Sequence, residues 1–585
     1  MVTAFVASSG GLAVDASASS TATTVSARMS SQGGSRRASR FTSRRYRGTA
    51  GGESEHGPSD QGRTPPAYAR TVRPWSDPKD RIRLRCRGPP VYSIVAAMNR
   101  RRLIALCLAA CLAVPLGGIA LASAQAHDLA WKDCGDGLRC AELVVPVDWA
   151  DPGGPRTSVH VAKLPATGKS IGPLIINFGG PGTSTSMLRR KNQPDAQPEL
   201  PSLLDELQRS FDVIAIDPRG LAEPASSKRV SCAEPDASVF GLLLARTKQD
   251  WDTHAAKNAA HQASCRKAAK SAWRGMTAWN VAHDLDTLRA SLGQDKLIYA
   301  GNSYGTVYAQ AYLELFPQRV SRMYFDGTAD HTQQEFEPWI RNYARTQERH
   351  LTRFRDWCAR RTDCALRGTD AGKAWDELVA RVRRAPLPAS AGRTVHEGQL
   401  YAGAIKGMNP ALWPQLATAI RKALDGDAGD FLQQLLPDEG GTSVSQDSLC
   451  NDFMPKLPTY EEFQGIEARL REIAPRFGWL EGRFELGRCW GRSGGASWAP
   501  HPLRVKDAPP ILFAIGELDN NTNYLGQAHV AEQIPSARVL WHGDGHASWA
   551  RNNCQRRHVN AYLTTGELPA PGTRCPAEII QKVGK

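Results

Sequence analysis

The pentapeptide Gly-Asn-Ser-Tyr-Gly at residues 301–305 constrains this chain most, because a strand-like segment precedes it and a helix-like segment follows it. The apolar run covers residues 296–300, and the helical stretch covers residues 306–316. In that context Gly-x-Ser-x-Gly predicts a tight strand-to-helix turn, which the glycines permit and which exposes a serine hydroxyl. The pattern therefore indicates a nucleophile at Ser303, with a purely structural turn as the alternative.

The N-terminal segment differs in composition from the rest of the chain. Residues 1–97 are rich in Ser, Arg and Gly and show no apolar periodicity, so we expect a disordered extension or upstream sequence translated from a misplaced start codon. A charged start at Met98, an apolar run and small-residue cleavage sites predict a signal peptide over residues 98–126. A membrane helix is one alternative, and lipid attachment at Cys111 is another.

The positive charge of the chain comes mainly from this N-terminal segment. The whole sequence has a formal net charge of +15, with 73 basic and 58 acidic residues. The first 126 residues hold 18 of those basic and 6 of those acidic residues, which leaves +3 on the remainder. No basic stripe remains to neutralise a run of phosphates, so we expect no nucleic-acid partner.

Ten cysteines follow residue 126, and an even number in an exported chain predicts disulfides. Pairing between sequence neighbours would give Cys134–Cys140, Cys232–Cys265, Cys358–Cys364, Cys450–Cys489 and Cys554–Cys575. Zinc binding is the competing use of cysteine. The chain has no Cys-x-x-Cys or histidine-paired spacing, so we expect no metal.

Apolar runs alternate with helical stretches over residues 127–330, which favours a mostly parallel sheet with helices on both faces. The expected strands are 142–149, 157–164, 173–178, 211–216, 296–300 and 320–325, the first two forming an antiparallel pair. Residues 331–500 look helical and are interpreted as an inserted cap. Strands at 510–515 and 537–541 and a final helix near 556–563 then complete the α/β core within residues 501–585.

A serine nucleophile needs a base and an acid that orients the base. Asp519 follows the predicted strand at 511–515, and His546 follows the one at 539–541. The chain order Ser303, Asp519, His546 is the order found in α/β-hydrolases. His546 would accept the Ser303 proton, and Asp519 would hold the imidazole in the required tautomer.

Three other titratable residues compete for these roles. His542 lies inside a strand-like run, where a side chain usually packs, so we favour His546 as the base. Glu517 lies two residues from Asp519, and Asp326 ends the strand at 320–325. Asp519 is preferred as the acid because it lies beyond the strand end and is followed by turn-forming asparagines.

An oxyanion hole should combine the backbone N–H of Tyr304 with a second N–H from an earlier loop. The glycine-rich segment Asn-Phe-Gly-Gly-Pro-Gly at 177–182 is the candidate, with Gly180 as the second donor and Gly179 as the alternative. A phosphate-binding loop would be the rival interpretation. The segment lacks the Lys-Ser/Thr ending of a P-loop, which argues against it.

Motifs along the chain resemble the secreted tripeptidyl aminopeptidase and prolyl aminopeptidase group of α/β-hydrolases, over nearly all of residues 130–576. They are the opening segment 131–148, Gly-Gly-Pro-Gly at 179–182, Asp-Pro-Arg-Gly at 217–220, Asp-Leu-Asp at 284–286 with Arg289 and Leu-Gly at 292–293, the pentapeptide 301–305, Gly-Glu-Leu-Asp at 516–519, Gly-His at 545–546, and Gly-Glu-Leu-Pro at 566–569 through Cys575.

The resemblance implies the α/β-hydrolase fold and the removal of short peptides or single residues from free N-termini, with acidic cap residues that recognise the ammonium group. Asp452 occupies a place similar to an acidic position of the group, and a solvated surface carboxylate is the alternative for it. The chain departs from the group at residues 221–224, which are Leu-Ala-Glu-Pro, and at residues 520–523, which are Asn-Asn-Thr-Asn. The substrate preference therefore does not carry over directly.

We therefore expect an exported serine aminopeptidase, secreted or periplasmic, that acts on peptides through an acyl-enzyme on Ser303. No cofactor is expected, and no membrane span should remain after signal removal. An esterase or lipase of the same fold is one alternative. A non-catalytic binder that retains the scaffold is another.

Overall fold

The computed structural model describes residues 129–193, 198–221, 229–433 and 441–578, which all belong to one compact unit. The predicted extension, the signal peptide and Cys111 lie outside these residues, as do residues 222–224. They stay predictions.

Ten strands of the described chain form one sheet, confirming the mostly parallel α/β class. In spatial order they are β1 (Lys132–Asp133), β2 (Arg139–Pro146), β3 (Arg156–Leu164), β5 (Asp212–Ile216), β4 (Pro173–Asn177), β6 (Leu297–Asn302), β7 (Val320–Asp326), β10 (Ile511–Gly516), β11 (Ala537–His542) and β12 (Arg574–Cys575). Strands β1, β2, β3 and β5 pair antiparallel, and every later pairing is parallel. The parallel strands bring their carboxyl ends to one edge of the sheet.

The strands of this sheet differ from the expected ones only at their ends, except that the two-residue strands β1 and β12 were not foreseen; the short pair formed by residues 387–389 and 393–395 was not foreseen either. The largest shift is in β2, which runs from Arg139 to Pro146 instead of over 142–149. A tight turn follows it, in which the Asp151 N–H bonds the Asp148 carbonyl at 3.0 Å. Polar residues at such turns satisfy the backbone locally, which ends the strand.

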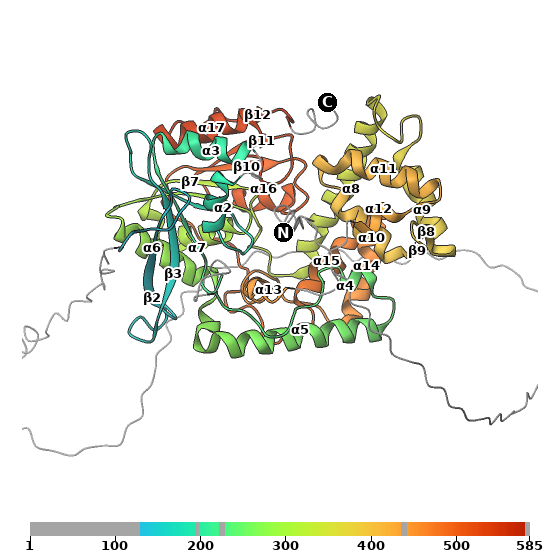
Figure 1. Cartoon of the computed structure of the whole chain (residues 1–585), viewed down its shortest axis with the longest axis horizontal. Helices are drawn as coiled ribbons and strands as arrows, with labels where there is room; N and C mark the ends of the chain where they lie inside the picture. Colours follow the sequence, from blue (N-terminus) through green and yellow to red (C-terminus); the bar gives the residue numbers. More distant parts are fainter. Residues whose placement is uncertain (1–128, 194–197, 222–228, 434–440, 579–585) are drawn as a thin grey trace, which may run out of the picture. The chain divides into compact units, whose positions relative to one another are not determined.

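Helices cover both faces of the sheet (Figure 1). On one face lie α3 (Glu199–Gln208) and α17 (Asn553–Thr565), and on the other lie α6 (Ala278–Ser291), α7 (Gly305–Leu315) and α16 (Tyr524–Glu532). Alternate strand residues pack against opposite layers, as with Ile175 and Ile176 of β4. This alternation is the expected consequence of the two-residue repeat of a strand.

Between β7 and β10 the described chain is mainly helical. The elements are α8 (Phe336–Arg360), α9 (Ala371–Arg384), β8 (Leu387–Ala389), β9 (Arg393–Val395), α10 (Glu397–Gly407), α11 (Trp413–Leu424), α12 (Gly429–Gln433), α13 (Ser445–Cys450), α14 (Tyr460–Ile473) and α15 (Leu480–Cys489). Trp339, Trp375 and Trp413 are fully buried in this helical layer. The short helix α4 (Gly241–Leu244), from the earlier part of the chain, contacts α10 and α15. The helical layer therefore also recruits residues from before position 330.

All five predicted disulfides are present: Cys134–Cys140, Cys232–Cys265, Cys358–Cys364, Cys450–Cys489 and Cys554–Cys575. Such bonds form and persist in oxidising compartments. Across the described ranges, no helix combines the length and apolar character needed to cross a membrane.

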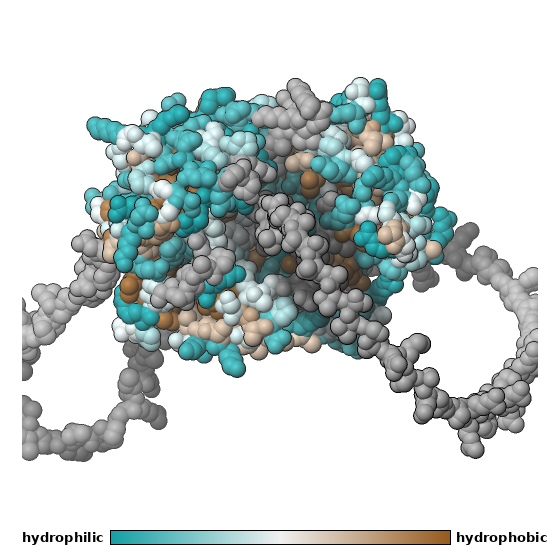
Figure 2. Space-filling view, viewed as in Figure 1, coloured by the Kyte–Doolittle hydropathy of each residue, from teal (hydrophilic) through white to brown (hydrophobic). Residues whose placement is uncertain are grey.

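The surface drawn in Figure 2 is mainly hydrophilic, with hydrophobic side chains in smaller patches. Among the described residues, Val144 and Ile171 are the exposed large hydrophobics. The two sides of the sheet and the helical layer therefore enclose most of the large apolar side chains.

Candidate active site

Ser303 lies on the turn between β6 and α7, as the pentapeptide predicts. Its φ angle is +52°, which is unusual for a residue with a side chain and is held by the surrounding structure. The Ser303 N–H bonds the Asp326 carbonyl at 2.9 Å, and the Ser303 carbonyl accepts from the Thr306 hydroxyl at 2.6 Å. These bonds tie the turn to the end of β7 and to the first turn of α7.

The two glycines of the pentapeptide are required by close packing. A Cβ atom on Gly301 would stand 2.7 Å from the Gly305 carbonyl oxygen, and one on Gly305 would stand 2.7 Å from the Asn177 carbonyl oxygen. Any larger residue at either position would push the turn away from β4. The motif thus sets both the shape of the turn and its distance from the neighbouring strand.

Asp519 and His546 form a buried pair beyond the ends of β10 and β11. These strands are parallel neighbours in which Gly516 is opposite His542, so the loops that follow them meet. The Nδ1 atom of His546 lies 2.9 Å from Oδ2 of Asp519. Because an ionised carboxylate only accepts, Nδ1–H donates, which leaves Nε2 as the ring nitrogen that can exchange a proton with Ser303. Within the described chain Nε2 makes no hydrogen bond.

Further donors surround the Asp519 carboxylate. Oδ2 accepts from the Thr522 hydroxyl at 2.8 Å and from the Gln527 amide at 2.9 Å, while Oδ1 accepts from the Asn521 and Thr522 N–H groups. Burial alone would raise the pKa of Asp519, but the charge and hydrogen bond of His546, together with the Thr522 donors, lower it below its usual value. Asp519 therefore stays ionised and orients His546. Neither the Thr522 contact nor the Gln527 contact was foreseen from the sequence.

Gly327 brings the serine turn and the His–Asp pair together. It follows Asp326, whose carbonyl holds the Ser303 N–H, and it has a φ of +59°. A Cβ on Gly327 would lie 2.7 Å from Nδ1 of His546 and 3.1 Å from Oδ2 of Asp519. Only glycine leaves room for the pair at this point. The position of this glycine directly after a predicted strand is the one feature of the sequence that could have indicated its place near the catalytic residues.

The Ser303 hydroxyl is buried and makes no hydrogen bond to any described residue. A serine–histidine bond is often long without substrate and tightens when substrate is bound. The structure thus places the three predicted residues around the end of β7, with the histidine–aspartate bond formed and the serine hydroxyl unengaged.

The competing candidates have other partners. His542 is buried at the end of β11, and burial lowers its pKa to about 4. The Asp326 carboxylate accepts from Gln555 at 3.2 Å, and burial raises its pKa to about 6. Glu517 forms salt bridges with Arg574 and Arg353. None of the three hydrogen-bonds His546 within the described chain.

The glycine-rich loop after β4 lies against the serine turn. A Cβ on Gly179 would stand 2.8 Å from the Ser303 Cβ and 3.1 Å from the Tyr304 nitrogen. The Gly179 N–H already donates to the Asn177 side chain at 2.9 Å. The N–H groups of Gly180 and Tyr304 have no acceptor within the described part of the chain. Gly180 and Tyr304 are thus better placed than Gly179 to bind an oxyanion.

Asp452 is buried, so the solvated alternative for it is wrong. Its side chain is 1% exposed, and Oδ2 accepts from the Ala278 N–H at 2.6 Å and from the Tyr304 hydroxyl at 3.1 Å. Burial raises the pKa of Asp452 to about 8. Its predicted role in binding substrate stays a prediction.

Two further acidic residues of the helical layer lie near the catalytic acid. Glu481 and Glu485 of α15 are buried, and Gln347 bridges Glu481 to the carbonyl of Asn520, the residue after Asp519. Arg488 pairs with Glu485 at 2.9 Å, whereas Glu481 has no salt bridge in the described chain. Burial and the neighbouring Glu485 raise the pKa of Glu481 to about 8. Their four-residue spacing is ordinary for a helix, so the sequence gave no signal.

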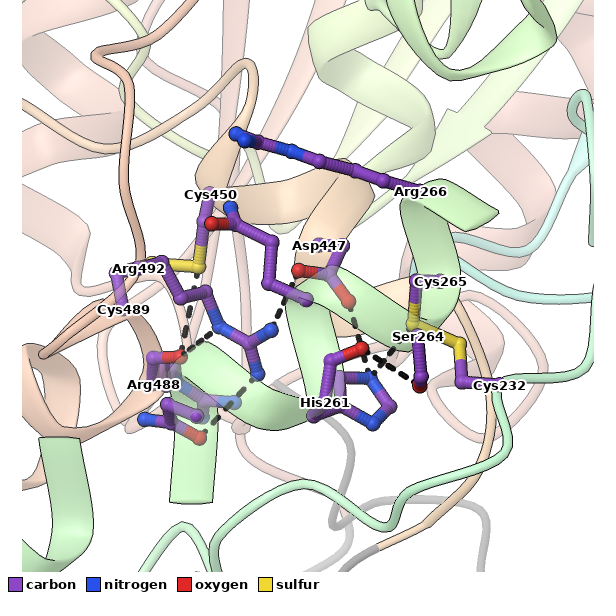
Figure 3. Close-up of polar contacts among 12 residues, drawn as sticks. Cys232, His261, Ser264, Cys265, Arg266, Asp447, Cys450, Arg488, Cys489 and Arg492 are labelled. Carbon is purple, nitrogen blue, oxygen red and sulfur yellow. Dashed lines mark hydrogen bonds and ion pairs between the residues drawn. A yellow bond between two sulfur atoms is a disulfide. The ribbon is translucent and has the colours of Figure 1, made fainter. Parts of the chain in front are cut away.

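A second polar cluster contains His261, Asp447 and the Cys232–Cys265 disulfide (Figure 3). The ligand atoms of these four residues lie within 4.8 Å of one another. Both sulfur atoms are joined in the disulfide, and Nε2 of His261 lies 3.0 Å from Oδ2 of Asp447. A zinc ion needs thiolates and a neutral imidazole, so the oxidised cluster does not fit one.

Comparison with known proteins agrees with this geometry. A family model for the alpha/beta hydrolase fold matches residues 172–548. The serine protease Hip1 of Mycobacterium tuberculosis is 29% identical over 513 residues, covering 81% of this chain and 96% of that protein. A tripeptidyl aminopeptidase of Streptomyces lividans is 25% identical over 495 residues, covering 78% of this chain and 89% of that protein. A carboxylesterase B of M. tuberculosis is 28% identical over 469 residues, covering 75% and 86%.

Proposed function

The chain belongs to the α/β-hydrolase fold family and is a serine hydrolase, and we propose that it is an aminopeptidase that releases short peptides or single residues from free N-termini. The observation that carries the proposal is the His546–Asp519 bond beside the strained Ser303 turn. Similarity to Hip1 and to the tripeptidyl aminopeptidase supports peptides as the substrate class.

The reaction would proceed in two halves. Ser303 Oγ attacks the scissile carbonyl carbon while its proton passes to Nε2 of His546, and Asp519 stabilises the imidazolium. The N–H groups of Gly180 and Tyr304 hold the oxyanion. His546 then returns the proton to the leaving amine, the C–N bond breaks, and an ester on Ser303 remains. A water molecule, deprotonated by His546, cleaves that ester and restores the serine hydroxyl.

The substrate ammonium group would be bound by Glu481 and Glu485. Of these two buried carboxyl groups only Glu485 pairs with an arginine, which leaves Glu481 without a cation in the described chain. An ammonium ion supplies that missing charge and favours the ionised form of Glu481. Glu481→Gln should raise KM for peptides with a free N-terminus and leave KM for an ester without an amine unchanged. An equal change for both substrates would reject this role.

We also propose a location for the enzyme, supported by its disulfides and by the predicted signal peptide. Five disulfides fit an oxidising compartment. We place the mature protein outside the cytoplasm, released by cleavage near residue 126. N-terminal sequencing of the exported protein tests this, and a mature chain that still begins at Met98 would contradict it.

An esterase is the second candidate, because the carboxylesterase B is nearly as similar to this chain as Hip1 is. The same three residues would cleave an ester. The two candidates differ in whether amides are cleaved and whether a free N-terminus is required.

Hydrolysis of tripeptidyl and aminoacyl amides with free or acetylated N-termini, alongside short-chain esters, tests the proposal. Wild type is compared with Ser303→Ala and with the exposed-loop control Ser170→Ala. We expect cleavage only of free N-termini, a loss in kcat on the order of 10³-fold or more for Ser303→Ala, and no loss for the control. Ester turnover alone would favour the esterase, and full turnover by Ser303→Ala would exclude Ser303 as the nucleophile.

A further inference from the structure

Tyr304, the residue after the nucleophile, is anchored through its side chain. Its ring is buried and packs edge-on against Tyr308 and Phe453, with centroid distances of 5.3 and 5.8 Å. Its hydroxyl donates to Oδ2 of Asp452 at 3.1 Å. The backbone N–H of this same residue has no acceptor in the described chain and is one of the two oxyanion donors of the proposed reaction. Whatever fixes the ring therefore also limits movement of that N–H.

Asp452 connects three separate segments at one point. Besides Tyr304, its Oδ2 atom accepts from the N–H of Ala278, the first residue of α6, at 2.6 Å. Its own backbone carbonyl lies 2.9 Å from Nε2 of His331. The serine turn, the start of α6 and the segment after α13 are thus joined through one buried side chain.

The segment that carries Asp452 is itself firmly held (Figure 3). Five residues earlier, Asp447 pairs with Arg492 at 2.5 Å and with His261 at 3.0 Å. Two residues earlier, Cys450 is bonded to Cys489 at the end of α15. An acceptor on such a segment has little freedom to follow a moving tyrosine, so it can fix the position of Tyr304.

The burial of Asp452 argues against a role as a fixed negative charge. Its pKa is raised to about 8, mainly by burial, so the neutral carboxyl predominates near neutral pH. Its remaining atom Oδ1 has no partner among the described residues. What Asp452 supplies at neutral pH is a hydrogen-bond acceptor for Tyr304, and an isosteric amide would supply the same.

We propose that Asp452 is a positioning residue that holds Tyr304, and through it the oxyanion-binding N–H, beside Ser303. This role rests on the proposed function. A strained turn persists only where its surroundings determine it, and the Ser303 turn has a positive φ. The donor must also stay close to the oxyanion, because a shift of about 1 Å can reduce the rate on the order of 10²-fold. The bond from Tyr304 to Asp452 supports the strained turn and also keeps the donor N–H in place.

The test uses the full-length exported protein with four variants and one control. Asp452→Ala removes the acceptor, Tyr304→Phe removes only the hydroxyl, and the double variant tests their coupling. Asp452→Asn keeps an acceptor of the same shape. Ser448→Ala is the control, since Ser448 is a buried polar residue of α13 without a bond to Tyr304. The readouts are kcat and KM for a free tripeptidyl amide and for an ester without an amine, with melting temperatures.

We expect Asp452→Ala and Tyr304→Phe each to lower kcat by about 10- to 100-fold on both substrates, with KM changed less than about threefold. The double variant should be no worse than either single one, because both remove the same bond. Asp452→Asn and the control should keep kcat within about threefold of wild type. If Asp452→Ala does not fold, Tyr304→Phe carries the same prediction.

Two results would overturn the positioning role. One is an unchanged kcat in Tyr304→Phe, and the other is a loss limited to KM for free N-termini, which would make Asp452 an ammonium ligand. Labelling of Ser303 by a fluorophosphonate separates this failure from that of the proposed function. If wild type is not labelled, the proposed function fails and the positioning role fails with it.

Discussion

Two buried histidine–aspartate pairs among the described residues have nearly the same spacing. His546 lies 2.9 Å from Asp519 beside the serine turn, and His261 lies 3.0 Å from Asp447 under the Cys232–Cys265 disulfide. The difference lies in the other ring nitrogen. Nε2 of His546 is unbonded in the described chain, whereas Nδ1 of His261 donates to the Glu234 carbonyl at 2.7 Å. A histidine–aspartate pair is therefore not by itself a sign of catalysis.

The charge states of the two rings follow from their partners. Nδ1 of His261 faces the Glu234 carbonyl, and Nε2 lies 3.0 Å from Oδ2 of Asp447, so both contacts favour the charged ring. Burial opposes this charge, but Asp447 and the Glu234 carbonyl outweigh it and raise the pKa of His261. The partners of His546, Asp519 and Thr522, both lie on its Nδ1 side, which leaves Nε2 available to exchange a proton with Ser303. One histidine thus has both nitrogens engaged by the fold, and the other has Nε2 unengaged in the described chain.

The largest expected effect separates the two histidines. His546→Ala should lower kcat on the order of 10³-fold or more and change stability little. His261→Ala should keep kcat per folded molecule and lose about 3 kcal/mol of unfolding free energy, because it leaves a buried carboxylate with one partner fewer. Turnover by active-site titration and urea unfolding measure the two quantities. A large loss of kcat in His261→Ala together with a large loss of stability in His546→Ala would show that the two roles are reversed.

The disulfide beside His261 should contribute to stability alone. Replacing Cys232 and Cys265 by serine opens a loop with a sequence separation of 33 residues, for which chain entropy gives a loss of about 3 to 4 kcal/mol. The matched pair Cys358 and Cys364 spans only 6 residues and should lose about 2 kcal/mol. Urea denaturation measures both. If the variant without Cys232 and Cys265 also lost kcat, the cluster of this disulfide, His261 and Asp447 would have a role in catalysis.

The two pairs should affect stability at opposite ends of the pH scale. The pKa of His261 is raised above 6.5, so its contribution is complete below about pH 6.5 and is lost as pH rises through the raised value. The pKa of Asp519 is lowered below 3.8, so its contribution is complete above that pH and is lost as pH falls through the lowered value. His261→Gln should flatten the alkaline side of a melting-temperature profile, and Asp519→Asn the acid side. If both variants changed the melting temperature only at acid pH, or only at alkaline pH, the opposite pKa shifts of His261 and Asp519 would be contradicted.

The smallest expected effect comes from a donor to the catalytic acid. Thr522→Val removes one hydroxyl from Asp519 and leaves the backbone donors in place. We expect kcat to fall about tenfold, equivalent to about 1.4 kcal/mol, with KM nearly unchanged. Thr418→Val, on the exposed face of α11, is the control. Equal kcat values in the two variants would show that the Thr522 hydroxyl does not assist Asp519.

Local patterns predicted the parts of the molecule that depend on local structure. The Gly-x-Ser-x-Gly turn and the strand ends before Asp519 and His546 follow from short-range sequence and turn chemistry. The five cysteine pairs rested only on the assumption that cysteines pair with their sequence neighbours. The structure confirms the fold class and the disulfides, and it brings Ser303, Asp519 and His546 to the end of β7. Their catalytic roles await the variants above.

Contacts between distant segments could not be predicted in this way. Nothing near Asp447 in the sequence indicates that it pairs with a histidine 186 residues earlier. Likewise, the burial of Asp452 under Tyr304 and the approach of Glu481 to the loop after Asp519 depend on how the helical layer packs. Helical periodicity identifies a buried face but not its neighbour.

Each disulfide joins cysteines that are at most 39 residues apart, and none within the described chain links residues 331–500 to the strands on either side. The helical insertion therefore carries its own cysteine partners. In evolution, such a segment can be lost, gained or exchanged between related genes without leaving an unpaired thiol in the sheet. A chimeric enzyme that exchanges residues 331–500 as a block would keep every described disulfide, but it would also have to preserve the contacts of Asp447 with His261 and of Asp452 with Tyr304.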